Sequence, residues 1–255
     1  MYALKEERQR LILNLLERNG RVLASDLSEQ WELSEDTIRR DLREMADTGL
    51  IQRVHGGALR RLPSPPPFPS RRETDVESKD EIARAAADLI GEDSLVLIDG
   101  GTTTLQIASY LARDRRATIA TNSPPLALAL TGHLRLKVLL LGGTLLKDSQ
   151  VTVGIETVRG IEALHADLCL LGMCALHSRA GITAEDGDEA QTKRAMIDTS
   201  AEVIGLITRP KMETVLGYSV GRVSSLTEII TDTCDKDLLD QYASQGVRIR
   251  RMPDK

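Results

Sequence analysis

Hydrophobic residues recur at helical spacing in the first fifty residues of the chain. Residues 4–18 carry leucine and isoleucine along one side, and the Asn-Gly pair that follows ends this predicted helix. Residues 22–31 show a second helical pattern, with Leu23, Leu27 and Trp31 directed inward. A two-residue turn then leads to a third helical pattern, so the spacing is that of helices joined by a short turn.

The third predicted helix begins at Ser34 and ends near Gly49. A serine hydroxyl can accept hydrogen bonds from the free N–H groups of a first turn, and glycine is a frequent stop. Ile38, Leu42 and Met45 form one narrow apolar stripe, which must pack on the rest of a small domain. Polar residues occupy the other side of the helix, where Asp36, Arg40 and Arg43 point outward and Thr37 and Arg39 lie on the flanks.

Two short strand-like runs follow this helix on either side of the His-Gly-Gly segment 55–57, which predicts a β-hairpin. Helices joined by a short turn and followed by a hairpin are typical of a winged helix-turn-helix, a DNA-binding fold. Arginine suits such a surface because its planar guanidinium group can donate two hydrogen bonds at once, either to phosphate oxygens or to the guanine edge in the major groove. The alternative is a solvated face on which arginines pair with acidic neighbours. The candidate DNA-contacting residues are Ser34, Asp36, Thr37, Arg39, Arg40, Arg43, Arg53, His55 and Gly56.

Overall charge argues against a general attraction to nucleic acid or to membranes. The chain has 33 Lys and Arg against 38 Asp and Glu, a net charge of −5, so DNA binding must come from a local patch. Cys169, Cys174 and Cys234 lack metal-ligand spacing, so we expect no disulfide and no metal site, as in a reducing cytoplasm. The sequence shows no signal peptide and no apolar run of membrane-spanning length, which favours a cytoplasmic protein without a membrane partner.

Five prolines in residues 62–70 separate the two halves of the chain. Proline lacks the N–H donor that a helix interior or a central strand needs. Residues 62–71 are therefore predicted to be a stiff extended linker between a domain at 1–61 and a domain at 72–255. A polyproline ligand for a partner domain is the alternative.

Strand-like and helical patterns alternate beyond the linker. Predicted strands with their following turns cover residues 94–101, 117–122, 136–143, 166–172, 202–207 and 228–232. Predicted helices cover residues 72–90, 104–111 and 124–130, and residues 180–200 are expected to be a loop followed by a helix. This alternation predicts an α/β fold with a mainly parallel sheet.

Small polar residues follow successive predicted strands, and ligands of parallel sheets bind beyond the carboxyl ends of strands. Residues 99–104, Asp-Gly-Gly-Thr-Thr-Thr, precede a helix, where N–H groups, the helix dipole and hydroxyls make an anion cradle. Each loop alone is an ordinary turn, but three of them predict a binding pocket, with Lys193 or Arg194 as phosphate partner. The candidate ligand-binding residues here are Asp99, Gly100, Gly101, Thr102, Thr103, Thr104, Thr121, Asn122, Gly142, Gly143 and Lys193.

The chain resembles the DeoR family of bacterial transcription regulators in DTIRRDL, which follows a serine, and in GLIQRVHGGA. This resemblance implies a winged helix-turn-helix in which Thr37 and the arginines of the third helix contact operator DNA and HGGA forms the wing. The second half of the chain resembles the family's sensor domain in the motifs DGGTTT, TNS, LLGG, GIT followed by QTKRAM, and IITD. That domain is related in fold to ribose-5-phosphate isomerases and coenzyme A transferases. It implies a pocket for a phosphorylated sugar or similar metabolite, with Thr102–Thr104 near the phosphate and Lys193 as charge partner.

Two stretches depart from the family pattern. Residues 172–175 read GMCA where the family commonly has an Asp-Gly or similar pair, and residues 208–211 read TRPK where it commonly has Asp followed by Ser and Lys. Only Lys211 matches in the second stretch, and by analogy it joins the candidate ligand-binding residues. The resemblance implies a repressor without a cofactor that binds operator DNA as a homo-oligomer, a dimer or a tetramer, and is released by the metabolite.

Two alternatives concern the second domain. A sugar-phosphate isomerase needs a carboxylate base, which the acidic cluster 185–189 can supply, although acidic residues also suit a solvated helix N-terminus. No nucleophile constellation accompanies this cluster, and we expect no enzyme activity. The other alternative is a domain that only oligomerises, in which the polar loops are structural turns.

Overall fold

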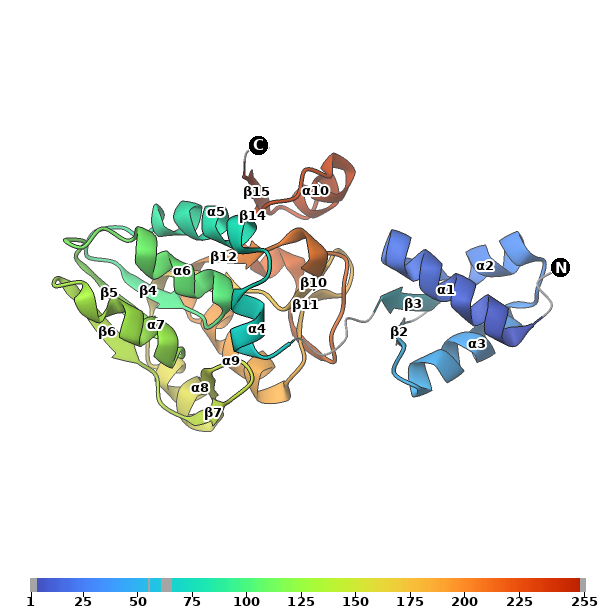
Figure 1. The fold of residues 1–255 in the computed structure, drawn as a ribbon, viewed down its shortest axis with the longest axis horizontal. Coiled ribbons are helices and arrows are strands. Elements are labelled where there is room, and N and C mark those ends of the chain that lie inside the picture. The colour runs from blue at the N-terminus through green and yellow to red at the C-terminus, as the bar shows by residue number, and fades with distance from the viewer. Residues whose placement is uncertain (1–3, 55, 61–65, 253–255) are drawn as a thin grey trace. The chain divides into compact units, whose positions relative to one another are not determined.

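The chain forms two compact units (Figure 1). The computed structural model describes residues 4–54, 56–60 and 66–252, except for the side chains of residues 17–19 and 60. The N-terminal unit comprises Met1–Pro63 with Glu213–Leu216, and the C-terminal unit comprises Ser64–Met212 with Gly217–Lys255. Among the described residues, no helix has the length and apolar character needed to cross a membrane.

Three helices and three short strands build the N-terminal unit. They are α1 (Lys5–Asn19), β1 (Arg21–Leu23), α2 (Ala24–Trp31), α3 (Glu35–Asp47), β2 (Ile51–Val54) and β3 (Gly57–Arg60). The strands pair antiparallel in the order β1-β3-β2. The stripe predicted for the third helix forms the centre of the core, because Ile38, Leu42 and Met45 are each at most 1% exposed. The three predicted helices and the hairpin are therefore confirmed.

Residues 21–23 differ from the prediction, because they form strand β1 and not the start of the second helix. β1 places Leu23 opposite Gly57 of β3. A Cβ atom at Gly57 would lie 2.0 Å from the Val22 carbonyl oxygen, so this close approach requires glycine. The pairing joins residues far apart in the chain, which helical periodicity does not report. Leu23 is consequently half-buried, and Gly57 lies within a strand rather than at the hairpin tip.

The C-terminal unit is a parallel sheet with helices on both faces (Figure 1). Its helices are α4 (Phe68–Arg72), α5 (Val76–Ala87), α6 (Thr102–Tyr110), α7 (Pro124–Ala129), α8 (Ile155–Glu162), α9 (Gly187–Asp198) and α10 (Lys236–Ala243), with single 3₁₀ turns at Leu130–Gly132, Arg209–Lys211 and Val223–Ser225. Its strands are β4 (Leu95–Ile98), β5 (Ala117–Thr121), β6 (Leu136–Leu140), β7 (Thr144–Leu146), β8 (Val151–Val153), β9 (Ala166–Gly172), β10 (Ala175–His177), β11 (Gly181–Ala184), β12 (Ser200–Ile207), β13 (Tyr218–Gly221), β14 (Glu228–Thr231) and β15 (Arg248–Arg251).

Seven of these strands form one sheet in the order β15-β14-β12-β9-β4-β5-β6, and every neighbouring pair is parallel. Successive residues of the central strand β4 enter opposite cores. Val96 and Ile98 pack with α5 and α6, whereas Leu97 packs on the face that carries α8 and α9. Burial on both faces explains why these strands are nearly continuous apolar runs. The predicted α/β fold with a mainly parallel sheet is confirmed.

The proline-rich segment is helical over part of its length, so the expected extended linker is wrong there. Residues 61–65 lie outside the described residues, but Phe68–Arg72 form helix α4. Pro69 stands in the first turn, where a missing N–H donor has no cost. Phe68 is 2% exposed, and its N–H donates to the Asp148 carbonyl oxygen at 2.8 Å. A buried aromatic side chain and a tertiary hydrogen bond thus attach this segment to the C-terminal unit.

The segment expected to be a loop before α9 contains a buried strand. Gly181–Ala184 form β11, which pairs antiparallel with β10 and β13 in a second, smaller sheet. Gly181 has φ of 78°, and a Cβ there would lie 2.2 Å from the Gly221 carbonyl oxygen. Glycine at position 181 therefore permits close strand pairing.

Candidate functional site

The outer face of α3 is positioned by its N-cap. The Ser34 hydroxyl accepts a hydrogen bond from the Thr37 N–H at 3.2 Å and lies 2.9 Å from the Thr37 hydroxyl, as expected for a capping serine. With the apolar stripe buried, Arg39, Arg40 and Arg43 are exposed on the other side of the helix. Asp36 is also exposed and Thr37 is half-buried, so these predicted DNA-contacting residues share an accessible face.

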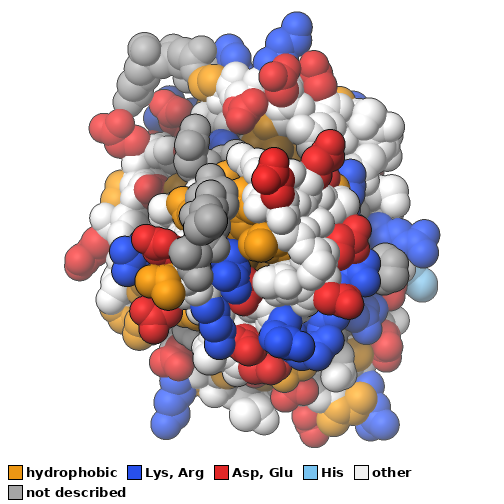
Figure 2. Space-filling view, turned by 90° about the vertical axis from the view of Figure 1, so that its right-hand side faces the viewer, with side chains coloured by type: hydrophobic (Ala, Val, Ile, Leu, Met, Phe, Trp, Pro, Cys, Tyr) orange, Lys and Arg blue, Asp and Glu red, His pale blue; other side chains and the backbone are white. Residues whose placement is uncertain are grey.

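The acidic residues of α3 pair mainly away from this face. Asp41 is 2% exposed and accepts a hydrogen bond from the Arg8 Nε at 2.7 Å, while Glu44 pairs with Lys5. Arg39 pairs with Glu35, one turn earlier. Within the part of the chain that the structure describes, no ion pair involves Arg40 or Arg43. These two arginines are therefore cations available to an external anion. Figure 2 shows basic and acidic side chains interspersed on one face of the molecule.

The hairpin contributes one further basic residue that the structure describes. Arg53 is exposed on β2, and Gly56 has φ of 82° at the tip, a conformation that favours glycine. His55, also expected to contact DNA, lies outside the described residues.

A second site lies in the C-terminal unit, where β4 ends and α6 begins. Thr102, Thr103 and Thr104 form the first turn of α6 and line a pocket together with Gly100 and Gly101. A Cβ atom at Gly100 would lie 2.0 Å from the Val151 side chain, so glycine allows the loop to pack against β8. Free N–H groups, hydroxyls and the positive end of the helix dipole from the first of the three predicted loops therefore meet at one cavity.

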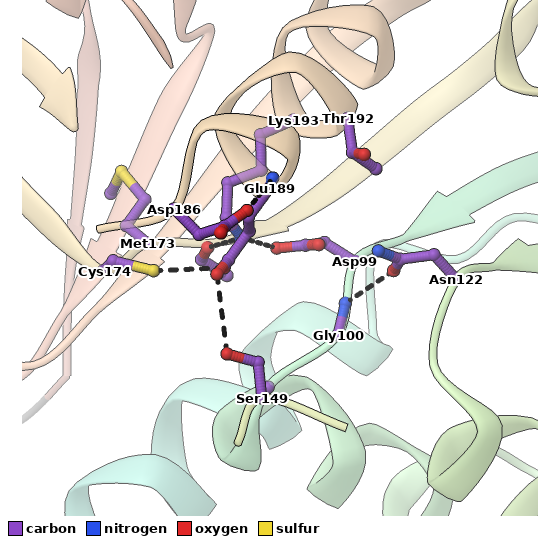
Figure 3. A network of polar contacts seen from close by, with 12 residues as sticks. Asp99, Gly100, Asn122, Ser149, Met173, Cys174, Asp186, Glu189, Thr192 and Lys193 are labelled. Atoms are coloured by element: carbon purple, nitrogen blue, oxygen red, sulfur yellow. Dashed lines mark hydrogen bonds and ion pairs between the residues drawn. The ribbon is translucent and has the colours of Figure 1, made fainter. Parts of the chain in front are cut away.

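Asp99 and Asn122 hold this loop from behind (Figure 3). The Asn122 side chain accepts a hydrogen bond from the Gly100 N–H at 3.0 Å and donates to the Thr152 carbonyl oxygen at 3.1 Å. Asp99 is 1% exposed and forms an ion pair with Lys193. Both candidates thus orient the pocket loop without lining the cavity.

The structure corrects the role expected for Lys193. Its ammonium group pairs with Asp99, donates to the Gly172 carbonyl oxygen at 2.8 Å and lies 3.3 Å from a Glu189 carboxylate oxygen. Burial alone would lower the pKa of Lys193, but the charges of Asp99 and Glu189 raise it above its ordinary value. An ammonium has three protons, and here three acceptors take them. Lys193 therefore stabilises residues at the back of the pocket, Asp99 and Gly172 among them, and does not line the cavity itself. The other candidate, Arg194, donates to the Val220 and Ser219 carbonyl oxygens.

Two other cations line the pocket, one expected and one missed. Lys211 donates to the Met173 carbonyl oxygen at 3.2 Å, and burial, followed by the charges of Arg71 and Lys193, lowers its pKa. Arg71 projects from α4 and donates to the Asp148 carbonyl oxygen at 3.4 Å. Its position was assigned to the linker, and the two consecutive arginines at 71–72 were the one signal that could have identified it.

The remaining sequence candidates lie outside the pocket lining. Thr121 is fully buried, and its hydroxyl accepts a hydrogen bond from the Ser123 N–H at 3.1 Å. The Gly142 carbonyl oxygen accepts from the Thr157 hydroxyl at 2.6 Å, and a Cβ at Gly143 would lie 2.1 Å from that hydroxyl. The second and third predicted loops therefore stabilise the fold beside the first one, and only residues 100–104 and Lys211 of the predicted set line the cavity.

Further lining residues come from four separate segments, namely Ser149, Gly172, Met173, Cys174, Glu189 and Leu206. The expectation of a solvated acidic cluster at 185–189 is wrong for Glu189, because this side chain is buried at 7% exposure. Asp186 does cap α9, accepting the Glu189 N–H at 2.9 Å. The Cys174 thiol donates to Glu189 at 3.3 Å, and burial, with the Glu189 charge, raises its pKa to about 12. The thiol is therefore protonated at neutral pH.

The arrangement can bind a small anion. The first turn of α6, Arg71 and Lys211 supply donors and positive charge, and Lys193, Asp99 and Asn122 fix the loop that carries them. The cavity has a volume of about 20 Å³, about the space of one water molecule. Binding of a larger ligand therefore requires lining side chains to move apart.

In comparisons with known proteins, two family descriptions match separate parts of the chain. The family description "DeoR-like helix-turn-helix domain" matches residues 8–61, and "DeoR C terminal sensor domain" matches residues 74–233. The HTH-type transcriptional regulator GlpR of Haloferax volcanii is 34% identical over 250 residues, which cover 96% of this chain and 97% of that protein. The glycerol-3-phosphate regulon repressor of Escherichia coli K12 is 32% identical over 229 residues, covering 89% and 90%.

The HTH-type transcriptional repressor GlcR of Bacillus subtilis is 31% identical over 247 residues and is covered, like this chain, to 93%. Among solved structures, ribose 5-phosphate isomerase A of Neisseria gonorrhoeae matches 55% of this chain and 54% of its own, with a TM-score of 0.40 and 13% identity.

Proposed function

Because this chain belongs to the DeoR family of DNA-binding transcription regulators, we propose that it represses a carbohydrate catabolic operon and leaves its operator when a phosphorylated metabolite binds. The observation that supports the effector is the single cavity in which the first turn of α6 meets Arg71 and Lys211. Several relatives carry matching names, such as the glycerol-3-phosphate regulon repressor of Escherichia coli.

On the DNA side, the proposal assigns contact with the operator to the face of α3. Arg40 and Arg43 reach base edges or phosphates, and Ser34, Asp36, Thr37 and Arg39 border them. Arg53 and the hairpin tip contact the DNA backbone beside the groove. One helix of this kind reads few base pairs, so the protein binds repeated half-sites as a homo-oligomer, a dimer or a tetramer.

On the effector side, the phosphate binds at Gly100–Thr104 with Arg71 and Lys211 as charge partners, and Asp99, Asn122 and Lys193 support that loop. The metabolite changes the DNA affinity only if it binds the free conformation more tightly than the operator-bound one. The small cavity supports such a difference, because a ligand larger than water would move lining side chains such as Arg71 of α4 and Ser149 of the β7–β8 loop.

The test is fluorescence anisotropy on operator DNA taken from immediately upstream of the protein's own gene. Phosphorylated sugars and polyols are added one at a time, each beside its unphosphorylated form. Release by a phosphorylated compound alone supports the proposal. Tight DNA binding that no compound disturbs would instead favour a C-terminal unit that serves only to assemble the oligomer, and turnover of pentose phosphates would favour an isomerase.

A further inference from the structure

Glu189 is an acidic residue in the lining of a pocket otherwise built for an anion. It lies in the first turn of α9 (Figure 3) and is 7% exposed. Arg71 and Lys211 line the same cavity. This carboxylate pairs with Lys193, but it opposes the binding of phosphate, because like charges repel strongly where solvent screening is low.

The two oxygens of this carboxylate have different surroundings. Oε1 lies 3.3 Å from the Lys193 ammonium and accepts a hydrogen bond from the Cys174 thiol at 3.3 Å. Among the described residues, Oε2 accepts only from the Ser149 hydroxyl, at 3.5 Å, which is the outer limit for a hydrogen bond. Figure 3 shows the carboxylate directed at Ser149, which also lines the cavity. Oε2 therefore retains acceptor capacity on the pocket side.

The charge on Glu189 is maintained by its neighbours. Burial alone would raise its pKa, but Lys193, the Cys174 and Lys193 hydrogen bonds and Arg71 lower that pKa below its ordinary value. At neutral pH the side chain is thus a carboxylate that can accept hydrogen bonds but cannot donate one.

We propose that Glu189 determines the effector class, by accepting a hydrogen bond from a ligand hydroxyl through Oε2 and by repelling a second anionic group. The pocket then selects monophosphates of polyols or sugars, and it discriminates against phosphorylated carboxylic acids of the same length. This inference rests on the proposed function, that is, on a phosphate bound at the first turn of α6. It adds a residue that recognises the part of the ligand beyond the phosphate.

The physical basis is the asymmetry between hydroxyl and carboxylate ligands at a buried acceptor. A hydroxyl donates its proton to Oε2 and replaces the long contact with Ser149. A carboxylate at the same place brings a second negative charge and no donor, so one of the two groups must stay unpaired or take up a proton. A site built around a hydrogen-bonding group rejects an analogue that cannot satisfy it.

The test uses two matched pairs of compounds. Glycerol 3-phosphate is compared with 3-phosphoglycerate, and glucitol 6-phosphate with 6-phosphogluconate, so that each pair differs in a terminal hydroxymethyl or carboxylate group. Inorganic phosphate is a further probe of the cationic side alone. Affinities for the full-length wild type, Glu189→Gln, Glu189→Asp and Asp188→Asn are measured by isothermal titration calorimetry. Asp188 is exposed in the same helical turn, so its variant is the control for lost charge.

We expect the wild type and Asp188→Asn to bind at least one hydroxymethyl compound about tenfold or more tightly than its carboxylate counterpart. Glu189→Gln should reduce this ratio by about tenfold, because an amide can donate to the carboxylate. Glu189→Asp keeps the negative charge, but the shorter side chain holds the carboxylate farther from the ligand. This variant should therefore bind the hydroxymethyl compounds more weakly and still exclude the carboxylate compounds. This second variant carries the test if Glu189→Gln does not fold.

An unchanged ratio in the Glu189 variants, or a wild type that prefers the carboxylates, would overturn the inference. Binding of inorganic phosphate without any gain from the hydroxymethyl compounds would overturn it too, while leaving the phosphate site in place. Failure of the wild type to bind any of the five probes would remove the proposed effector function itself and this inference with it.

Discussion

Both candidate sites use cations to meet phosphate, but they present them in opposite environments. On α3, Arg40 and Arg43 lie within one turn of each other, exposed and without ion pairs to other described residues. In the pocket, Arg71 and Lys211 come from segments far apart in the chain, and both donate to backbone carbonyl groups. One site is local in sequence and open to solvent. The other exists only after folding.

This contrast has consequences for energetics. Exposed cations need no internal counter-charge, but their attraction for DNA weakens as salt rises. Cations that folding removes from water lose hydration, fully at Lys193 and in part at Arg71 and Lys211. The fold must compensate this loss with carbonyl groups and carboxylates. The ion pairs of Lys193 with Asp99 and Glu189 belong to this compensation. The pocket should therefore depend on the stability of its unit, and the α3 face should not.

The largest effect is expected on the stability of the C-terminal unit, when Lys193 is replaced. Lys193→Met leaves the buried Asp99 and Glu189 carboxylates without their cation, and should destabilise the C-terminal unit by about 3 to 5 kcal/mol. Urea unfolding followed by circular dichroism measures this loss. Trp31, the one tryptophan of the chain, lies in the N-terminal unit, so its fluorescence transition should stay in place. Lys137→Met, at an exposed position of β6, is the control. An equally stable Lys193→Met would refute the supporting role of the network.

The second effect concerns the open site. Arg40→Ala should weaken operator binding by about tenfold to a hundredfold, since one specific arginine contact is worth about 1 to 3 kcal/mol. Its unfolding transition should be unchanged, because the side chain is exposed. Anisotropy titrations at two salt concentrations measure both the affinity and its salt dependence. Arg10→Ala removes an exposed arginine from α1 and should bind the operator normally. Wild-type affinity in Arg40→Ala would refute the assignment of α3 as the recognition helix.

A third, smaller effect sharpens the comparison within the pocket. Lys211→Met should leave operator affinity in the absence of ligand unchanged and weaken the response to phosphorylated compounds by about tenfold, the value of one charge-assisted hydrogen bond. Because the pocket is screened less than the α3 face, this loss should persist at high salt, where the Arg40→Ala loss diminishes. The matched control is Lys236→Met, at an exposed position of α10. A full response to phosphorylated compounds in Lys211→Met would mean that the phosphate does not bind at Lys211.

The same contrast explains how far each region could be predicted from the sequence. The α3 face depends on local spacing and on a cap between Ser34 and Thr37, and both are visible in a single helical segment. Strand β1 was missed because its pairing with β3 is non-local. Edge strand β15 was missed because its arginines hide any apolar alternation. The central strands were found because burial on both faces makes them apolar runs.

The pocket could be predicted only in part, for the same physical reason. Thr102–Thr104 can be recognised from the sequence, because a glycine turn followed by hydroxyl-bearing residues is typical of a strand-to-helix junction. Lys193 was assigned to the ligand because its counter-ion Asp99 lies 94 residues earlier. Glu189 looked solvated because acidic residues surround it in the sequence, whereas folding places it against Lys193 and Cys174. Long-range charge pairing has no local sequence signal.

The smallest effect is a difference in alkylation rate between two cysteines, and its measurement does not involve DNA or effector binding. Cys234 is exposed, whereas Cys174 lines the pocket, where burial and the Glu189 charge raise its pKa to about 12. Only a thiolate reacts with iodoacetamide, so at pH 8 we expect Cys234 to be alkylated while Cys174 stays unmodified. The Cys174 rate should rise as the pH approaches 12. Peptide mass spectrometry measures both rates, and Cys234→Ser is the control. Equal alkylation at pH 8 would mean that the pocket opens readily without ligand, which would remove the difference between a closed site and an open face.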